Sequence, residues 1–409
     1  MPWQEVSTMS LRLAFVQQAS APDANLSALC AQFGISRPTG YKWLARYQQA
    51  GMAGLAERSR RPHTSPRQTA AATEQQVVAL RTQHPAWGGR KLRARLSVLA
   101  PQQALPAAST ITVLLRRQGL LAAGDATARR TVSAPQRFSH PAPNDLWQMD
   151  FKGHLPLTTP PGARCHPLTV LDDHSRFALG LLACANEQHA TVQAALTRLF
   201  RTYGVPQRIL CDNGAPWGSA GGPTPWTRLS VWLARLGIAV SHGRPRHPQT
   251  QGKDERFHRT LRAEALTQPL ATPLRDLAHA QAVFDTWRQV YNGERPHEAL
   301  GLTVPAQHYT PSPRPFPATV PPLEYPASQA VRHVQQEGWI SWRGHLYAVG
   351  GAFVGQPVGL YPTQEEHLLA VYFADPCVAA LDTRLQRAYP VARYDPKHRS
   401  LVNHVPEHL

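Results

Sequence analysis

The middle of the chain alternates short apolar runs with amphipathic segments. Residues 146–152 (LWQMDFK) switch between apolar and polar positions with a period of two, which predicts a half-buried strand. Helical spacing of apolar residues predicts helices at 189–203 and 226–236. Apolar runs bounded by turn residues predict further strands at 166–171, 177–184, 207–211 and 238–241. The order of these elements predicts an α/β domain with helices packed on a sheet.

A further helix begins near Lys253 and closes this order. Pro248 and Gly252 favour a loop before it, whereas the residues that follow are helix formers or long polar chains. Glu255 therefore lies in the first turn, and at about 100° per residue it shares a face with His258, Arg259 and Arg262. By itself this pattern fits a solvated amphipathic helix as well as one that holds a metal ion beside a phosphate. Three strands, then alternating helices and strands, is the element order of a ribonuclease-H-like domain.

The N-terminal part shows the pattern of a helix-turn-helix. Helices are predicted at 11–20, 25–33 and 37–47, with Asn25 and Ser36 as N-caps. The last helix starts with polar and basic residues, which is typical of a recognition helix that enters a DNA groove. The side chains expected to face DNA are Arg37, Thr39, Lys42 and Arg46. The alternative is an ordinary helical hairpin.

A second unit of the same kind follows a basic linker, whose Arg58, Arg60 and Arg61 suit phosphate contacts. Helices are predicted at 73–82, 90–96 and 110–118, the last with Ser109 as its cap. The side chains of this unit expected to contact DNA are Arg90, Lys91, Arg93, Thr110 and Arg116. Complementarity to the helix dipole is an alternative explanation for Arg116.

The C-terminal part has the pattern of a small β domain. A Pro-rich connector at 311–328 leads into strands predicted at 331–334, 339–342, 345–349, 355–360 and 368–373. Short strands separated by Gly or charged turns predict a small SH3-like β-barrel over 329–382. We expect residues 383–409 to form a poorly ordered tail.

These patterns together predict a multidomain chain: α-helical units, then an α/β core, then the β-barrel. The predicted boundaries are a helix-turn-helix domain at 1–60, a second one at 61–122, a linker at 123–143 and a ribonuclease-H-like core at 144–310.

The charge of the chain adds a polyanionic partner to this picture. The formal net charge is +17 and the isoelectric point is about 10.3. The excess lies at the N-terminus, because residues 1–140 hold 18 Lys and Arg against 5 Asp and Glu, whereas residues 305–409 hold 8 of each kind. A basic N-terminal part in front of a nearly neutral remainder predicts nucleic acid binding by the helical units.

The cysteines and the hydropathy pattern point to a cytoplasmic protein. The five cysteines are scattered and odd in number, which predicts neither a disulfide framework nor a zinc site. Three histidines near Glu255 lack the close fourth ligand of a zinc site: His242, His247 and His258. No run approaches the roughly 18 apolar residues of a membrane span, and no signal pattern opens the chain. We expect no membrane partner.

Three carboxylates have related settings in the predicted core. Asp150 lies on the first strand, Asp212 ends the fourth, and Glu255 starts a helix, with separations of 62 and 43 residues. Ligands of α/β sheets gather at the carboxyl ends of strands and at nearby helix starts. Two Mg²⁺ ions suit such oxygen ligands. Three carboxylates and two divalent ions together carry a net charge of +1, which one scissile phosphodiester would neutralise. Mn²⁺ is the expected substitute.

Other acidic residues have simpler explanations. Asp172 and Asp173 lie in a predicted hairpin, where aspartate is a favoured turn residue. Asp254 lies about 100° around the helix from Glu255. It would replace Glu255 in the site if the helix started later than expected.

The motifs around these carboxylates resemble those of a known family. Asp150 in WQMDF, Asp212 in LCDNGAPWG and Glu255 in HPQTQGKDERFHRTLRAE resemble the DDE motif of retroviral-integrase-type transposases. The likeness is to bacterial insertion-sequence transposases of family four hundred and eighty-one, a sister of family three. Residues 291–301 (YNGERPHEALG) resemble the element that follows the core there. The resemblance covers roughly residues 25–310.

Two features depart from the retroviral pattern. The stretch from Asp212 to Glu255 is longer, and its extra length is expected in residues 218–236. Helix-turn-helix units stand in the place of the retroviral zinc domain.

The resemblance implies a DNA transposase of the nucleoid that binds terminal inverted repeats, cleaves the element ends and joins them to target DNA. It implies Asp150, Asp212 and Glu255 as catalytic metal ligands, double-stranded DNA as substrate, and at least a dimer. Basic side chains beside Glu255 are expected to contact DNA: Lys253, Arg256, Arg259 and Arg262. The alternatives are a non-catalytic repressor derived from a transposase and a nuclease without strand transfer.

Overall fold

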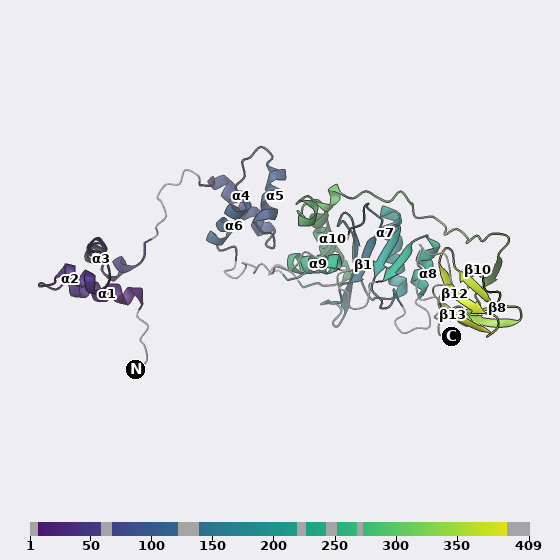
Figure 1. Ribbon diagram of the computed structural model, residues 1–409. Helices are drawn as coiled ribbons and strands as arrows, with labels where there is room; N and C mark the ends of the chain where they lie inside the picture. Colours follow the sequence, from purple (N-terminus) through teal and green to yellow (C-terminus); the bar gives the residue numbers. More distant parts are fainter. Residues whose placement is uncertain are drawn as a thin grey trace. The chain divides into compact units, whose positions relative to one another are not determined.

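The computed structural model describes residues 7–58, 68–121, 139–218, 226–242, 252–267 and 273–390. The chain divides into two compact units, Met1–Thr69 and Ala70–Leu409, which we describe separately (Figure 1). Arg60, Arg61, most of the predicted 123–143 linker, and the loop that precedes Gly252 lie outside the described residues.

The first unit has the helices that the pattern predicts. They are α1 (Thr8–Ala19), α2 (Leu26–Gln32) and α3 (Arg37–Ala50), followed by a short 3-10 turn. Asn25 caps α2 as predicted, since its side chain accepts from the amides of Ser27 and Ala28. Ser36 precedes α3 but makes no capping bond, because its hydroxyl pairs with that of Thr39 instead. The buried core consists of Phe15, Val16, Cys30, Trp43 and Leu55.

The second unit opens with three helices: α4 (Ala71–Gln83), α5 (Gly89–Leu99) and α6 (Ala108–Arg117). The predicted cap at Ser109 is wrong, because α6 starts at Ala108, two residues before the predicted Thr110, and Ala107 is its N-cap residue. Val77, Trp87, Leu92, Ile111 and Leu115 are among the residues of its apolar core.

A central sheet follows, in the order β2-β3-β1-β5-β6, with β4 paired to β3. Its strands are β1 (Trp147–Phe151), β2 (Leu155–Pro156), β3 (Arg164–Asp172), β4 (Ala178–Cys184), β5 (Arg208–Cys211) and β6 (Ala239–His242). β1 runs antiparallel to β3 and parallel to β5. All predicted strands of the core are present, and β2 is an unpredicted short addition.

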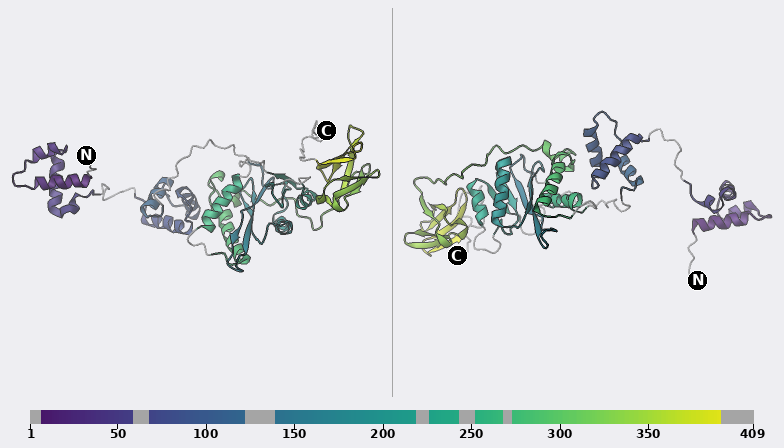
Figure 2. Two further views of the ribbon diagram at one scale, coloured as in Figure 1. Left: turned by 90° about the horizontal axis from the view of Figure 1, so that it is seen from below. Right: turned by 180° about the vertical axis from the view of Figure 1, so that it is seen from behind.

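Helices cover both faces of this sheet, as Figure 2 shows. α7 (His189–Tyr203) and α8 (Arg228–Arg235) share one apolar core with the sheet, and α9 (Gly252–Leu261) and α10 (Leu277–Gly293) share another. Side chains alternate along β1, so Trp147 and Met149 join the α7 core and Gln148 and Asp150 face the other way. A π-helical turn, Arg262–Leu266, extends α9. α10 was not predicted.

The C-terminal region is rich in β structure. An antiparallel sheet has the order β13-β12-β11-β10-β7, and β8 and β9 form a separate ladder. The strands are β7 (Ala330–His333), β8 (Trp339–Trp342), β9 (His345–Ala348), β10 (Pro357–Pro362), β11 (Leu368–Tyr372), β12 (Cys377–Asp382) and β13 (Arg387–Pro390). Within the described residues these ladders do not join into a closed barrel. The predicted tail starts too early, because β13 pairs with β12 and extends the domain past residue 383.

The Pro-rich connector is fastened to the core. The Arg314 guanidinium donates to the carbonyl oxygens of Pro206, Leu236 and Gly237 at 2.8–3.0 Å. Arg314 thereby ties the connector to the loops that follow α7 and α8. No helix in the described part of the chain is long and apolar enough to cross a membrane.

Candidate active site

Two of the predicted carboxylates are brought together by the parallel pairing of β1 and β5. Gln148 is opposite Leu210 in this ladder. Asp150 and Asp212 each lie two residues beyond that pair, where β5 has just ended. The sheet therefore delivers both side chains to the carboxyl end of two adjacent strands, which is where α/β sheets bind their ligands.

The electrostatics of the pair show that the two carboxylates are close. Burial and then the charge of Asp212 raise the pKa of Asp150 to about 6. Burial also raises the pKa of Asp212, although the amide of Gly214 donates to its Oδ1 at 3.1 Å. Partly buried like charges disfavour ionisation of both groups unless a cation joins them.

The charge of Glu187 contributes to the raised pKa values of both aspartates. It lies three residues after the end of β4, and its carboxylate accepts from His166 Nδ1 at 2.8 Å. Glu187 was not among the predicted site residues. The one signal for it was its position three residues after the predicted strand at 177–184.

α9 presents two carboxylates side by side in different surroundings. Asp254 is 1% exposed and its carboxylate oxygens have no hydrogen-bond partner in the described part of the chain. Burial, then the charges of Asp150 and Asp173, hold the pKa of Asp254 well above its usual range. Glu255 lies in the first turn, as predicted, and is exposed. The structure therefore turns Asp254 toward Asp150 and leaves Glu255 at the edge of the helix.

His258 connects α9 to the strand that carries Asp150. Its Nε2 lies 2.9 Å from the hydroxyl of Thr169, which donates to the backbone oxygen of Asp150 at 2.9 Å. Its Nδ1 is 3.9 Å from Asp150 Oδ2. Burial lowers the pKa of His258 to about 4, so the imidazole is neutral at physiological pH. The bond through Thr169 therefore holds α9 against β1 and β3.

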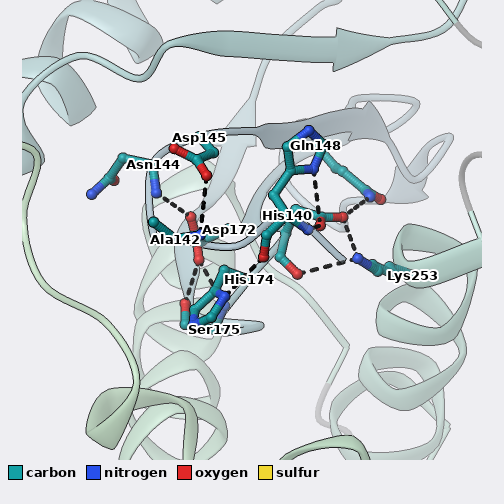
Figure 3. A network of polar contacts seen from close by, with 10 residues as sticks. His140, Ala142, Asn144, Asp145, Gln148, Asp172, His174, Ser175 and Lys253 are labelled. Carbon is teal, nitrogen blue, oxygen red and sulfur yellow. Dashed lines mark hydrogen bonds and ion pairs between the residues drawn. The ribbon is translucent and has the colours of Figure 1, made fainter. Parts of the chain in front are cut away.

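The two aspartates of the β3–β4 turn are buried and bonded (Figure 3). Asp172 accepts from the amide of Asn144 and from the amide and hydroxyl of Ser175, at 2.6–2.8 Å. These are the bonds of a structural turn.

Asp173 joins three separate segments. It accepts from Gln148 Nε2 at 2.7 Å and from the amide of His140 at 2.9 Å, and it forms an ion pair with Lys253. The predicted DNA contact of Lys253 would compete with this ion pair, because its ammonium lies against a fully buried carboxylate. The partner, Asp173, lies 80 residues earlier in the sequence, so no local pattern indicated the pair.

The other basic residues beside α9 remain predicted DNA contacts. Arg256, Arg259 and Arg262 are exposed in the structure. In the first unit, Arg37, Lys42 and Arg58 are exposed, while Thr39 and Arg46 are partly covered. The Arg46 guanidinium lies 5.1 Å from the Trp43 ring centre, so it both packs and reaches solvent.

The basic residues of α5 have intramolecular partners. Arg90 pairs with Glu298 at 3.3 Å, and Arg95 pairs with Glu294 at 2.8 Å. Burial, then the charge of Arg295, lower the pKa of Lys91 to about 8. The predicted DNA contacts at Arg90 and Lys91 would therefore compete with contacts to residues 294–298. Arg93, Thr110 and Arg116 are exposed.

The carboxylates only partly complete a metal site in this conformation. Within the described residues no cluster of three His, Cys, Asp or Glu side chains could hold a metal ion. Asp150 and Asp212 nevertheless fit a divalent cation, because their oxygens are hard ligands and burial raises the pKa of both, with the charge of Asp212 adding to the shift of Asp150.

Comparison with known proteins matches this architecture. The integrase core domain family matches residues 140–248, and a second integrase core domain family matches residues 236–305. The C-terminal domain of IS481 family transposases matches residues 329–389. The chain thus contains segments that match an integrase core and the C-terminal domain of IS481 family transposases. A helix-turn-helix domain family matches residues 11–63 and a homeodomain-like family matches residues 39–115 in front of the integrase core.

Two curated relatives are proteins of bacterial insertion elements. An uncharacterized 31.7 kDa protein of insertion element IS407 from Burkholderia multivorans is 31% identical over 166 residues, which is 41% of this chain and 55% of that protein. A 39.2 kDa protein of IS476 from Xanthomonas euvesicatoria is 27% identical over 67% of this chain and 75% of the relative. The chain thus spans little more than half the length of the IS407 protein.

Solved structures with some likeness are retroviral. The magnesium-bound catalytic core of HTLV-2 integrase in its trimeric form is 16% identical, with a TM-score of 0.29, over 41% of this chain and 98% of that one. A simian T-cell lymphotropic virus intasome in complex with PP2A regulatory subunit B56 gamma is 14% identical, with a TM-score of 0.35, over 77% and 95% of the two chains. Such low scores support no conclusion about this chain.

Proposed function

We infer that this protein is a DNA transposase that cleaves the ends of an insertion element and joins them to target DNA. The observation that carries the proposal is the Asp150–Asp212 pair at the carboxyl ends of β1 and β5. It lies inside a matched integrase core, between helix-turn-helix domains and the C-terminal domain of a transposase family. The helix-turn-helix domains would recognise the inverted repeats at the element ends.

Glu255 is the third metal ligand in this proposal. Asp254 is completely buried, so a phosphate of DNA could not reach a metal ion held by it. Glu255 is exposed and lies about 100° around α9 from Asp254, and its longer side chain can swing toward the aspartates. His258, which already faces Asp150, lies between the two around the helix, about 40° from Asp254 and about 60° from Glu255.

In the reaction, the three carboxylates would bind the catalytic metal ions, and the basic side chains around them would bind the DNA. Two Mg²⁺ ions, or Mn²⁺ in their place, would activate a water or a 3′-hydroxyl and stabilise the leaving oxygen. Asp150 and Asp212, on adjacent strands, would hold these ions at the carboxyl edge of the sheet. Arg256, Arg259 and Arg262 are placed on or beside α9 to contact the backbone of the bound DNA.

One experiment separates this function from its rivals. Wild-type protein with Mg²⁺, end-sequence DNA and a plasmid is expected to yield strand-transfer product, and Asp212→Asn none, because the amide removes a metal ligand. Gel separation of labelled ends measures both cleavage and joining. Cleavage without joining would favour a nuclease, and binding without either product would favour a repressor.

The first helix-turn-helix gives a prediction of its own. Lys42→Ala is expected to weaken binding of end DNA and to lower the slope of log affinity against log salt by about one. Gln48→Ala, exposed on the same helix, should leave both unchanged. Fluorescence anisotropy at several salt concentrations measures the slopes. An unchanged slope for Lys42→Ala would assign α3 a role other than phosphate contact.

Assembly follows from the reaction, since joining two ends requires at least two active sites. We therefore propose at least a dimer on DNA. The C-terminal region has no excess charge, as residues 305–409 hold 8 basic and 8 acidic side chains. A β-rich domain of neutral charge suits subunit contact or positioning of the ends better than bulk phosphate binding.

A further inference from the structure

Lys253 stands apart from the other cations of α9 because its charge is used inside the protein. Its ammonium donates to the carboxylate of Asp173 and, at 3.2 Å, to the Asp173 backbone oxygen. The side chain of Asp173 is fully buried and that of Lys253 is 19% exposed. A buried carboxylate is retained only when bonded partners replace its water shell. This pair therefore has a defined geometry in the folded protein.

Asp173 connects that ammonium to the strand of the active site. Gln148 Nε2 donates to Asp173 Oδ1 at 2.7 Å, and the amide of Asp173 donates to the backbone oxygen of Leu146. Gln148 precedes Asp150 by two positions on β1, so both side chains lie on the same face of the sheet. Figure 3 shows Gln148 and Lys253 converging on this network from β1 and from α9. The first turn of α9 is thereby held against the strand that carries Asp150.

A second attachment lies one turn further along α9. His258 meets Thr169, which is paired with Asp150 in the β1–β3 ladder and donates to its backbone oxygen. Glu255 lies between the two attachments, at Lys253 and His258. Two fixed points on either side of a residue determine both the axial position and the rotation of its helix turn.

We propose that Lys253 is a positioning residue, which through its ion pair with Asp173 sets the first turn of α9 so that Glu255 can complete the metal site with Asp150 and Asp212. This inference rests on the proposed function, in which Glu255 is the third ligand. Partners that orient metal ligands are commonly worth about 10- to 100-fold in metal affinity.

Lys253→Met distinguishes positioning from simple electrostatics. Removing a cation beside a metal site should tighten metal binding through reduced repulsion, whereas loss of positioning should weaken it. We expect the dissociation constant for Mn²⁺, measured by electron paramagnetic resonance on the full chain, to rise about tenfold. Lys253→Arg should restore most of the affinity. Arg256→Met removes an exposed cation from the same helix and should not raise the constant.

Hydrogen exchange tests the structural step directly. The amides of residues 256–261 have hydrogen-bond partners inside α9, unlike those of its first four residues. In Lys253→Met these amides should exchange faster, while the amides of α7 should exchange as in the wild type. Asp173→Asn should act in the same way, and the double variant should lose no more Mn²⁺ affinity than the worse single one. Unchanged or tighter Mn²⁺ binding, or faster exchange throughout the core, would overturn the proposal.

The outcomes also separate this inference from the function on which it rests. Weaker Mn²⁺ binding in Lys253→Met, with no DNA joining by the wild type, would keep the positioning role and reject the transposase. DNA joining by the wild type, with unchanged Mn²⁺ binding in Lys253→Met, would support the transposase and reject the positioning role. Weaker DNA binding by Lys253→Met with normal Mn²⁺ affinity would indicate that Lys253 contacts DNA and would reject the positioning role.

Discussion

Glu255→Gln is expected to abolish strand transfer, by about 10³-fold or more, while end DNA still binds. The amide keeps the size of the side chain but lacks the charge of a metal ligand, and a loss of roughly 4 kcal/mol of transition-state stabilisation corresponds to that factor. The measurement is single-turnover joining of labelled ends to a plasmid at saturating Mg²⁺. Binding of the same DNA in EDTA checks that the helix-turn-helix domains still work.

Asp254→Asn is the matched control for Glu255→Gln. Burial, then the charge of Asp150, hold the pKa of Asp254 well above its usual range, and its side chain is buried. An amide of nearly the same shape should leave the joining rate close to that of the wild type, because in the proposed site Asp254 is not a metal ligand. Loss of joining in Asp254→Asn together with retention in Glu255→Gln would exchange the roles of the two residues.

Asp150→Asn is expected to lose all joining and to stabilise the protein when metal is absent. The folded-state pKa of Asp150, about 6, lies above the ordinary carboxyl value of 3.8. At neutral pH the folded protein therefore carries an ionised carboxylate that burial and Asp212 disfavour. Removing that charge should contribute about 1 kcal/mol, after allowance for partial solvent screening, or about 2–4 °C in Tm.

The pH dependence of this gain follows from the same shift. Between pH 4 and pH 6 the carboxyl is protonated in the folded chain and ionised in the unfolded chain, so wild-type stability falls as pH rises through this window. The advantage of Asp150→Asn should thus be full above about pH 6 and vanish near pH 4. Calorimetry in EDTA at several pH values measures it.

Added Mg²⁺ should raise the Tm of the wild type above that of Asp150→Asn. Metal binding stabilises the wild type by mass action, and Asp150→Asn lacks a ligand for it. An equal Tm of the two proteins in EDTA at pH 7.5, or an equal response to Mg²⁺, would count against a metal site at Asp150.

Local periodicity determined the elements around the site. The alternation in 146–152 and the apolar run before Asp212 predicted β1 and β5 within one residue of their ends, and the Pro- and Gly-free stretch after Gly252 predicted the start of α9 within one residue. Their order along the chain was also sufficient to expect Asp150 and Asp212 side by side, because adjacent parallel strands end at the same edge of a sheet. These inferences depend only on neighbours in sequence and on general rules of topology.

Tertiary structure alone decided how α9 is rotated and held. Phe257 and Leu261 are buried in the apolar core that α9 shares with α10, and this packing turns Asp254 inward and leaves Glu255 at the edge. A hydrophobic pattern locates a helix face only coarsely, whereas contacts with distant residues set its rotation. Lys253 illustrates the same limit, since its partner Asp173 lies 80 residues earlier in the chain and no local pattern reveals the pair.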